Sequence, residues 1–258
     1  MKRQMAVAGL VALCGCVVDS IDNESVQQSS SSILSGSTPS AGDTLAPKDV
    51  KYWIGTKLCS GVLITTSWVL TAAHCVKATD WGFAVTNPSG VSKNAWQVIR
   101  HPEAEPWGES PVASVDVALI ELISPLGTVS TGWGASTVSI GQTHKCYGFG
   151  QNDPYGNGAG TLRTANLAVV DDNGEGDVGD PPYPNRYTLI QNSFWQILSS
   201  GDSGGPCFDA SGVLAGVHST SAPGGVYESA EQTKMSYVSK WVRNTILGCN
   251  PDVEINCP

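Results

Sequence analysis

A serine in a glycine-rich run is the first candidate for chemistry in this sequence. Ser203 stands in the run Gly-Asp-Ser-Gly-Gly-Pro at residues 201–206, which suits neither a regular helix nor a regular strand. Glycine tolerates unusual backbone angles, so a tight turn there can expose the Ser203 hydroxyl and direct neighbouring backbone N–H groups into one small space. An acyl-transfer nucleophile requires an exposed hydroxyl and such an oxyanion hole. By itself, the run is equally typical of a glycine-rich surface turn.

A serine nucleophile also requires a base, and the base requires a carboxylate that orients it. His74, in Thr-Ala-Ala-His-Cys, follows a strand-like segment and has small neighbours that leave an imidazole reachable. Asp116 opens the apolar segment Asp-Val-Ala-Leu-Ile-Glu-Leu, and a carboxylate buried there needs a partner. Taken singly, His74 also fits a hydrogen-bonded core histidine and Asp116 a strand-capping aspartate. His101 and His144 have no such context, and we expect both at the surface.

Together, the three segments resemble the trypsin/chymotrypsin-like serine proteases. The motifs of that family occur here in the order His, Asp, Ser, as TAAHC, DVALIEL and GDSGGP. The resemblance runs from about residue 33 to residue 247. It implies an all-β fold of two six-stranded antiparallel β-barrels, with the active site between them and a C-terminal α-helix. It also implies a peptidase that uses neither a cofactor nor a metal ion.

The resemblance assigns roles to individual residues. It implies that Ser203 is the nucleophile and that His74 is its general base and then its general acid. Asp116 would hold the imidazole tautomer and stabilise the imidazolium. The backbone N–H groups of Gly201 and Ser203 would form the oxyanion hole. The implied reaction is hydrolysis of a peptide bond in a protein or peptide substrate through an acyl-enzyme.

Composition and strand patterning favour an all-β protein. The 258 residues carry a formal net charge of −9, which argues against nucleic acid and against electrostatic attachment to an anionic membrane. Short β-rich runs separated by turn residues predict a sandwich or barrel, and helical spacing appears only at residues 237–247. We place the boundary between the two barrels at about residues 130–145. The predicted strands are residues 50–54, 61–66, 68–71, 83–85, 97–99, 115–122, 146–148, 161–169, 212–217 and 225–227.

The first 32 residues do not belong to the predicted fold. A basic start and an apolar run too short to span a bilayer indicate a signal peptide over residues 1–16. Its end, Leu-Cys-Gly-Cys, resembles a bacterial lipobox, with cleavage before Cys16 and lipid on the Cys16 thiol; secretion without lipid is the alternative. Residues 17–32 are rich in serine and predict a disordered tether or propeptide. We therefore expect an exported monomer, either anchored to the membrane as a lipoprotein or secreted.

The cysteines indicate disulfides, because export places the chain in an oxidising compartment. Without Cys14 and Cys16 six cysteines remain, and six allow 15 connectivities. The family resemblance implies particular pairs. In the pair Cys146–Cys207, both cysteines are shifted by two residues from the family positions, which moves the bridge by one step along two antiparallel strands. The pair left over would close a C-terminal tail, residues 249–258. The family's bridge beside the specificity pocket has no counterpart, since Ser199 occupies one of its positions. The implied pairs are Cys59–Cys75, Cys146–Cys207 and Cys249–Cys257.

An activation step is also implied by the resemblance. Ile33 opens the segment Ile-Leu-Ser-Gly, which resembles the mature N-terminus of the family. In relatives the freed amine pairs with the aspartate before the serine, here Asp202, and such a buried ion pair can act as a switch. We therefore expect cleavage between Ser32 and Ile33, which would also release the protein from any lipid on Cys16. The alternative is that Ile33 is an ordinary tether residue.

The residues of the predicted specificity pocket depart from trypsin. Ile197 stands where trypsin has an aspartate, so a cationic substrate side chain would find no partner. His218 precedes Ser-Thr-Ser at residues 219–221, which replaces the family's Ser-Trp-Gly. Glutamate-specific members have a histidine at this position and two nearby serines, which match Ser200 and Ser221, and these groups can hydrogen-bond a carboxylate. Three interpretations of the pocket are therefore possible: specificity for cleavage after Glu or Asp, a small or apolar pocket over Ile197, or a purely structural role for His218. Ser219, the first residue of the Ser-Thr-Ser segment, is counted with this pocket.

A second class of function is also consistent with the sequence. The chain could be a catalytically silent, surface-anchored binding protein, since Thr220 replaces a tryptophan and the pocket disulfide has no counterpart. The intact His, Asp and Ser motifs argue against this interpretation. Residues 171–180 have some features of a calcium loop, but Pro182 stands where the loop requires a bidentate glutamate. We interpret that segment as a solvated loop.

Overall fold

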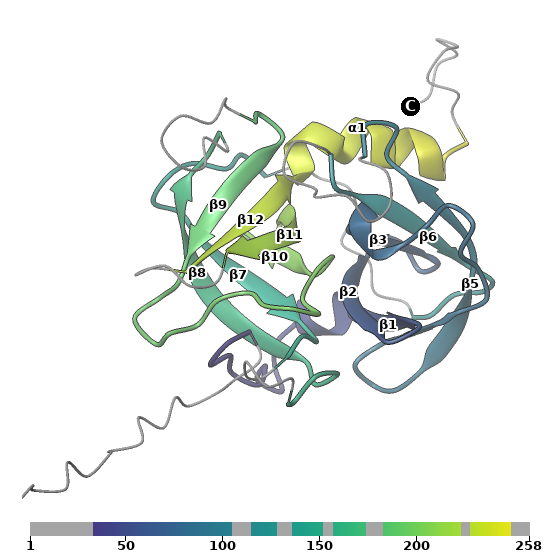
Figure 1. The fold of residues 1–258 in the computed structure, drawn as a ribbon, viewed down its shortest axis with the longest axis horizontal. Coiled ribbons are helices and arrows are strands. Elements are labelled where there is room, and N and C mark those ends of the chain that lie inside the picture. Colours follow the sequence, from purple (N-terminus) through teal and green to yellow (C-terminus); the bar gives the residue numbers. More distant parts are fainter. Residues whose placement is uncertain are drawn as a thin grey trace, which may run out of the picture.

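Two closed β-barrels and one C-terminal helix make up the fold (Figure 1). The structure is a computed structural model, and it describes residues 33–104, 115–127, 136–151, 157–173, 183–222 and 228–248. Each barrel has six antiparallel strands, so the predicted fold is confirmed. Within these described ranges, no helix is long and apolar enough to cross a membrane.

The first barrel closes in the order β1-β2-β3-β6-β5-β4. Its strand β2 is buried from its second residue to its end, because one face lines the barrel and the other meets the second barrel. Strand β5 is buried only at Ala95 and Val98, and a register shift after Ala95 bends it along the outer wall. The bounds are β1 Asp49–Ile54, β2 Lys57–Leu63, β3 Trp68–Thr71, β4 Ala84–Thr86, β5 Ser92–Arg100 and β6 Ala118–Leu122.

The second barrel closes in the order β10-β11-β12-β9-β8-β7, and the helix α1 follows its last strand directly. In α1 the buried residues Met235, Val238 and Val242 recur at helical spacing, so one face of the helix packs on the body. The bounds are β7 Thr143–Gly148, β8 Arg163–Asp171, β9 Arg186–Ile190, β10 Pro206–Phe208, β11 Leu214–Ala222, β12 Ser229–Lys234 and α1 Met235–Ile246. Two 3₁₀ helices, η1 Ala46–Lys48 and η2 Ala73–Cys75, lie in the first half of the chain.

A shared apolar cluster joins the two barrels. Leu70 of β3 and Leu119 of β6 pack in one cluster with Phe208 of β10, Val217 of β11 and Val238 of α1. Each barrel also has an interior cluster of its own. Because all five side chains are fully buried, the shared cluster fixes the position of each barrel against the other. A site composed of residues from both barrels therefore has a rigid support.

Three strands, β9, β10 and β12, were missing from the sequence prediction, and several boundaries shift. β10 has only three residues and directly follows the glycine-rich run, so it carries no detectable alternation. β9 begins at Arg186, whose side chain is only 1 % exposed and pairs with Glu231 of β12. A buried arginine does not fit the pattern expected of a barrel strand. The helix begins at Met235, two residues before the predicted start.

His144 is buried, so the prediction that it lies at the surface is wrong. It is 0 % exposed, and its Nδ1 lies 3.1 Å from the Tyr187 hydroxyl. Burial follows from the alternation along β7, which places His144 on the same inward face as Cys146. Burial also lowers the pKa of His144 to about 4. His101 is partly buried, and its ring lies 4.9 Å from that of Trp241.

Several predictions concern residues outside the described ranges. They are the signal peptide with Cys16, the tether up to Ser32, the tail with Cys249 and Cys257, most of the acidic loop 171–180 and the predicted strand 225–227.

Candidate active site

His74 and Asp116 form a close pair on neighbouring elements of the first barrel. His74 lies in η2, directly after β3, and Asp116 lies just before β6, which pairs with β3. The Asp116 Oδ2 atom accepts a hydrogen bond from His74 Nδ1 at 2.7 Å, and its Oδ1 atom accepts one from the His74 backbone N–H at 2.8 Å. This double contact fixes the imidazole ring and places the proton on Nδ1. The Nε2 atom is then left to accept a proton from another group.

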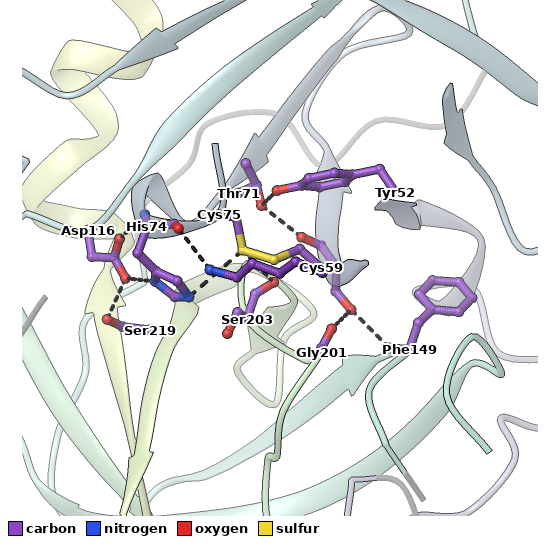
Figure 2. The surroundings of a disulfide bond; sticks show 12 residues. Tyr52, Cys59, Thr71, His74, Cys75, Asp116, Phe149, Gly201, Ser203 and Ser219 are labelled. Carbon is purple, nitrogen blue, oxygen red and sulfur yellow. Dashed lines mark hydrogen bonds and ion pairs between the residues drawn. A yellow bond between two sulfur atoms is a disulfide. The ribbon is translucent and has the colours of Figure 1, made fainter. Parts of the chain in front are cut away.

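A second donor to Asp116 comes from the other barrel. The Ser219 hydroxyl in β11 donates to Asp116 Oδ2 at 2.7 Å (Figure 2). Asp116 is 1 % exposed, and burial alone would raise its pKa. The hydrogen bonds and charge of His74 and the hydrogen bond from Ser219 outweigh that effect, so the pKa lies below the usual value. Asp116 is therefore ionised at neutral pH. Sequence reasoning placed Ser219 with the specificity pocket and did not anticipate its contact with Asp116.

Ser203 lies on the loop between β9 and β10, where the backbone requires glycine. Gly201 and Gly204 have φ angles of +94° and +86°. A Cβ atom at Gly204 would lie 2.1 Å from Thr71 Oγ1, so no other residue fits without displacing the neighbouring strand. The Sγ atom of Cys75 lies 3.8 Å from both His74 Nε2 and the Ser203 carbonyl oxygen. The Ser203 backbone and the His74 imidazole therefore both lie beside the Cys59–Cys75 disulfide. Figure 2 shows Ser203 and His74 around it.

The backbone N–H groups of Gly201 and Ser203 are candidates for binding an oxyanion. The N–H groups of Asp202, Gly204 and Gly205 donate to Ser199, His218 and Asp202 carbonyl oxygens, in that order. Within the described part of the chain, the N–H groups of Gly201 and Ser203 donate to no protein atom. Two free donors on the backbone of the serine and of the residue two positions before it are suited to binding an oxyanion.

Ser60 of β2 joins the serine loop to the first barrel. Its N–H donates to the Ser203 carbonyl oxygen at 2.9 Å, and its hydroxyl donates to the Gly201 carbonyl oxygen at 2.9 Å. The same hydroxyl oxygen accepts the N–H of Phe149 at 2.9 Å. Ser60 is 0 % exposed, so these bonds are shielded from water. Sequence reasoning missed Ser60, because nothing in its local sequence distinguishes it from other strand serines.

Two disulfides lie in the described residues. Cys59 is joined to Cys75, which fixes η2 and its His74 to β2. Cys146 of β7 is joined to Cys207 of β10, and the two residues are direct partners in the antiparallel register. These are the first two pairs that the family resemblance implies.

Asp202 is fully buried beneath the serine loop. Its carboxylate accepts N–H bonds from Gly150 at 2.7 Å, from Ser199 at 2.9 Å and from the backbone of Ile33. Burial raises the pKa of Asp202 to about 7, and these three bonds moderate the rise. Ile33 is 0 % exposed and has a φ angle of +29°, which a β-branched residue rarely adopts. Leu34 forms a β-bridge with Ile197 next to it.

His218 is neutral and held from both sides. Its Nδ1 atom lies 3.0 Å from the Gln232 side-chain amide nitrogen, which donates to it, so the ring proton is on Nε2. Nε2–H then donates to the Ser221 hydroxyl at 3.1 Å, and that hydroxyl donates to the Leu198 carbonyl oxygen at 2.7 Å. Burial, and to a lesser extent the His74 charge, lowers the pKa of His218 to about 3. Gln232, like Ser60, carried no signal in the sequence.

The remaining predicted pocket residues are separated from one another. Ile197 is 1 % exposed and packs in the interior cluster of the second barrel with Ile33. Ser200 is exposed and lines a cleft with Gly201 and Ser203. The structure therefore brings His218 and Ser221 together and places Ser200 nearer the serine loop.

The geometry defines a class of protein: a two-barrel fold with a histidine–carboxylate pair beside a serine on a glycine-rich turn. Among known families, the trypsin family model matches residues 33–242 of this chain. The protein belongs to the trypsin family of serine proteases.

Individual relatives are distant. An uncharacterized peptidase of Corynebacterium glutamicum is 28 % identical over 182 residues, which are 69 % of this chain and 59 % of the relative, so the chain spans well under two thirds of that protein. Human granzyme M is 29 % identical over 210 residues, covering 73 % of this chain and 79 % of granzyme M. Mouse neuropsin, a serine protease, superposes with a TM-score of 0.66 at 24 % identity and covers 78 % of this chain and 95 % of its own. The similarity to neuropsin concerns the fold.

Proposed function

We propose that this protein is a serine endopeptidase that uses His74, Asp116 and Ser203. The observation that carries the proposal is the 2.7 Å bond from His74 Nδ1 to the buried Asp116 carboxylate, in a site that also contains Ser203. Because Asp116 fixes the proton on Nδ1, His74 Nε2 is free to take the proton of the Ser203 hydroxyl.

The reaction then proceeds in two halves. Ser203 Oγ attacks the scissile carbonyl carbon while His74 Nε2 takes its proton, and the N–H groups of Gly201 and Ser203 bind the oxyanion. The C–N bond breaks as His74 gives the proton to the leaving amine, which yields the acyl-enzyme. Water, deprotonated by His74, attacks the acyl carbon, and Ser203 departs with the proton. Throughout, Asp116 stabilises the imidazolium, and Ser219 holds Asp116 in place.

Labelling with a fluorophosphonate probe tests this chemistry. The probe should modify Ser203, and Ser203→Ala should abolish labelling. A matched control is Ser211→Ala, since Ser211 lies on an exposed turn after β10 and should leave labelling intact. Failure of the correctly processed protein to react would instead favour a catalytically silent binding protein.

For specificity, we propose cleavage after Glu or Asp. Two observations support this preference: no cation-binding carboxylate stands at Ile197, and the Ser221 hydroxyl is backed by the buried His218. The hydroxyl can turn from the Leu198 carbonyl oxygen to a substrate carboxylate. A bound carboxylate would also favour protonation of His218 and so raise its pKa.

A peptide library that varies only the residue before the scissile bond tests this preference. We expect Glu to exceed Gln, and the ratio to grow as the pH falls from about 8 to about 5, where the substrate glutamate stays ionised. Gln232→Leu, which removes the Nδ1 partner of His218, should change that ratio. Cleavage after Leu, Ala or Phe with no preference for Glu would overturn the proposal and favour an apolar pocket.

We further propose that cleavage between Ser32 and Ile33 activates the protein. The buried Ile33 and its backbone bond to Asp202 support this step, and so does its positive φ angle, which removal of the preceding residue would relax. The new ammonium would pair with the Asp202 carboxylate. Export as a lipoprotein on Cys16, with later release by this cleavage, is part of the same proposal. N-terminal sequencing and the intact mass of the natural protein test both parts, and a chain that is fully active with Ser32 still attached would refute the activation step.

A further inference from the structure

A cleft beside the serine loop is lined by only one charged residue among those described. The cleft has a volume of about 290 Å³ and opens next to the oxyanion-binding N–H groups. Its walls come from the turn and start of the β1–β2 hairpin, from the segment after β7 and from the serine loop. The lining residues include Trp53, Lys57, Ser200, Gly201 and Ser203.

The position of the cleft determines which part of a peptide it accepts. The specificity proposed above directs the side chain before the scissile bond toward β11, where His218 and Ser221 lie, and no β11 residue lines the cleft. Lys57 lines the cleft, and its ammonium donates to the His74 carbonyl oxygen at 2.9 Å. Since His74 delivers the proton to the leaving amine, the departing half of the peptide lies on this side. The cleft therefore faces the residues that follow the scissile bond.

The chemistry of the walls selects the kind of side chain. An ammonium group has three N–H donors, and the bond to His74 uses one, so two remain. Trp53, 47 % exposed, lines the same cleft and offers an apolar surface for the stem of a side chain. Asp116, the carboxylate nearest the catalytic histidine, is buried and already accepts bonds from His74 and Ser219, so it does not compete for the Lys57 donors at the cleft surface.

We propose that Lys57 makes the enzyme prefer an acidic residue on the leaving-group side of the scissile bond, at the first or second position after it. The ammonium binds the carboxylate, and Trp53 packs against the aliphatic stem. Lys57 thus acts as a specificity-determining residue and takes no part in bond breaking. This inference rests on the proposed peptidase function and extends it to the second half of the substrate.

Matched peptides test the inference. They share one residue before the scissile bond, chosen as the best in the library, and differ only in Glu against Gln at each of the two following positions. The wild-type protein should cleave the better-placed Glu peptide about fivefold faster in kcat/KM, as expected for an exposed ion pair. The advantage should shrink at high salt, because solvent-exposed charges are screened.

Substitutions of Lys57 then assign the effect. Lys57→Gln should bring the Glu-to-Gln ratio to about one, and Lys57→Glu should reverse it in favour of the Gln peptide. Lys93→Gln is the matched control, since Lys93 lies in β5 and does not line the cleft, and its ratio should equal that of the wild type. A wild-type ratio of one, or a ratio that survives Lys57→Gln, overturns the inference.

The two proposals fail in different ways. If the fluorophosphonate does not label Ser203, the peptidase function fails and the inference falls with it. If Ser203 is labelled and the peptides are cleaved without a leaving-group preference, only the role of Lys57 fails.

Discussion

Replacing Asp202 with asparagine should damage the cleaved protein more than the intact chain. In the intact chain the Asp202 carboxylate accepts N–H bonds from Gly150, Ser199 and Ile33. Asparagine has nearly the same shape, but its amide nitrogen is a donor, so at least one of these buried N–H groups would face another donor. A buried donor without an acceptor costs about 1–3 kcal/mol.

Cleavage before Ile33 adds a larger penalty for the same substitution. The backbone amide of Ile33 becomes a buried ammonium, and Asp202 is its counterion. Removing one partner of a buried ion pair costs about 3–5 kcal/mol, because the remaining charge is left uncompensated. In the intact form the substitution also removes the cost of ionising the buried Asp202. We therefore expect Asp202→Asn to destabilise the cleaved form by at least about 2 kcal/mol more than the intact form, and to lower the activity of the cleaved form.

Urea unfolding of both forms, each with and without the substitution, measures the difference. Asp209→Asn is a suitable control, because Asp209 Oδ1 accepts N–H bonds from Ser211 at 2.8 Å and Val213 at 3.0 Å but contacts no terminus. Its cost should be equal in the two forms. If Asp202→Asn also costs the same in both, the freed Ile33 amine does not pair with Asp202, and the activation step proposed here is refuted.

Three further outcomes are expected. Asp116→Asn should reduce kcat by about 10⁴-fold, because the amide favours the wrong imidazole tautomer; an unchanged kcat would exclude Asp116 from the mechanism. Gly204→Ala should destabilise the fold by about 3 kcal/mol or more, since its Cβ would lie 2.1 Å from Thr71 Oγ1. The control Gly42→Ala, whose Cβ would have no atom within 4 Å, should change the stability little, and thermal unfolding of the two variants measures the difference. In the intact chain the pKa of Asp202 is raised to about 7, so the folded state holds a proton that the unfolded state loses at lower pH. The free energy of unfolding should therefore fall by about 4 kcal/mol as the pH rises from about 4 to about 7. If Asp202→Asn leaves this pH dependence unchanged, the raised pKa does not belong to Asp202.

Short motifs in the sequence predicted the fold and the residues that meet at the site. The reason is that His74, Asp116 and Ser203 each stand in a segment whose local sequence is constrained by its backbone. Gly204 illustrates this constraint, because a strand of the other barrel passes too close for any side chain. Motifs of this kind are visible without knowing what they contact.

Residues that act through contacts distant in the sequence were not predictable. Ser60 and Gln232 lie in ordinary strand patterns, and their partners are 143 and 14 residues away. His144 was misplaced for a related reason, since its burial depends on the register of β7 within the closed barrel. Strand alternation can indicate which side chains share a face, but it does not say which face turns inward.

The bonds of Ser60 and Ser219 have a consequence for the biogenesis of the protein. The first barrel supplies His74 and Asp116, the second supplies Ser203, and Ser60 and Ser219 each connect the two. Neither half of the chain holds a complete set of reacting groups. If the protein is the exported peptidase proposed above, a nascent or partly translocated chain should be unable to digest its neighbours, and proteolysis should begin only after both halves have folded and docked.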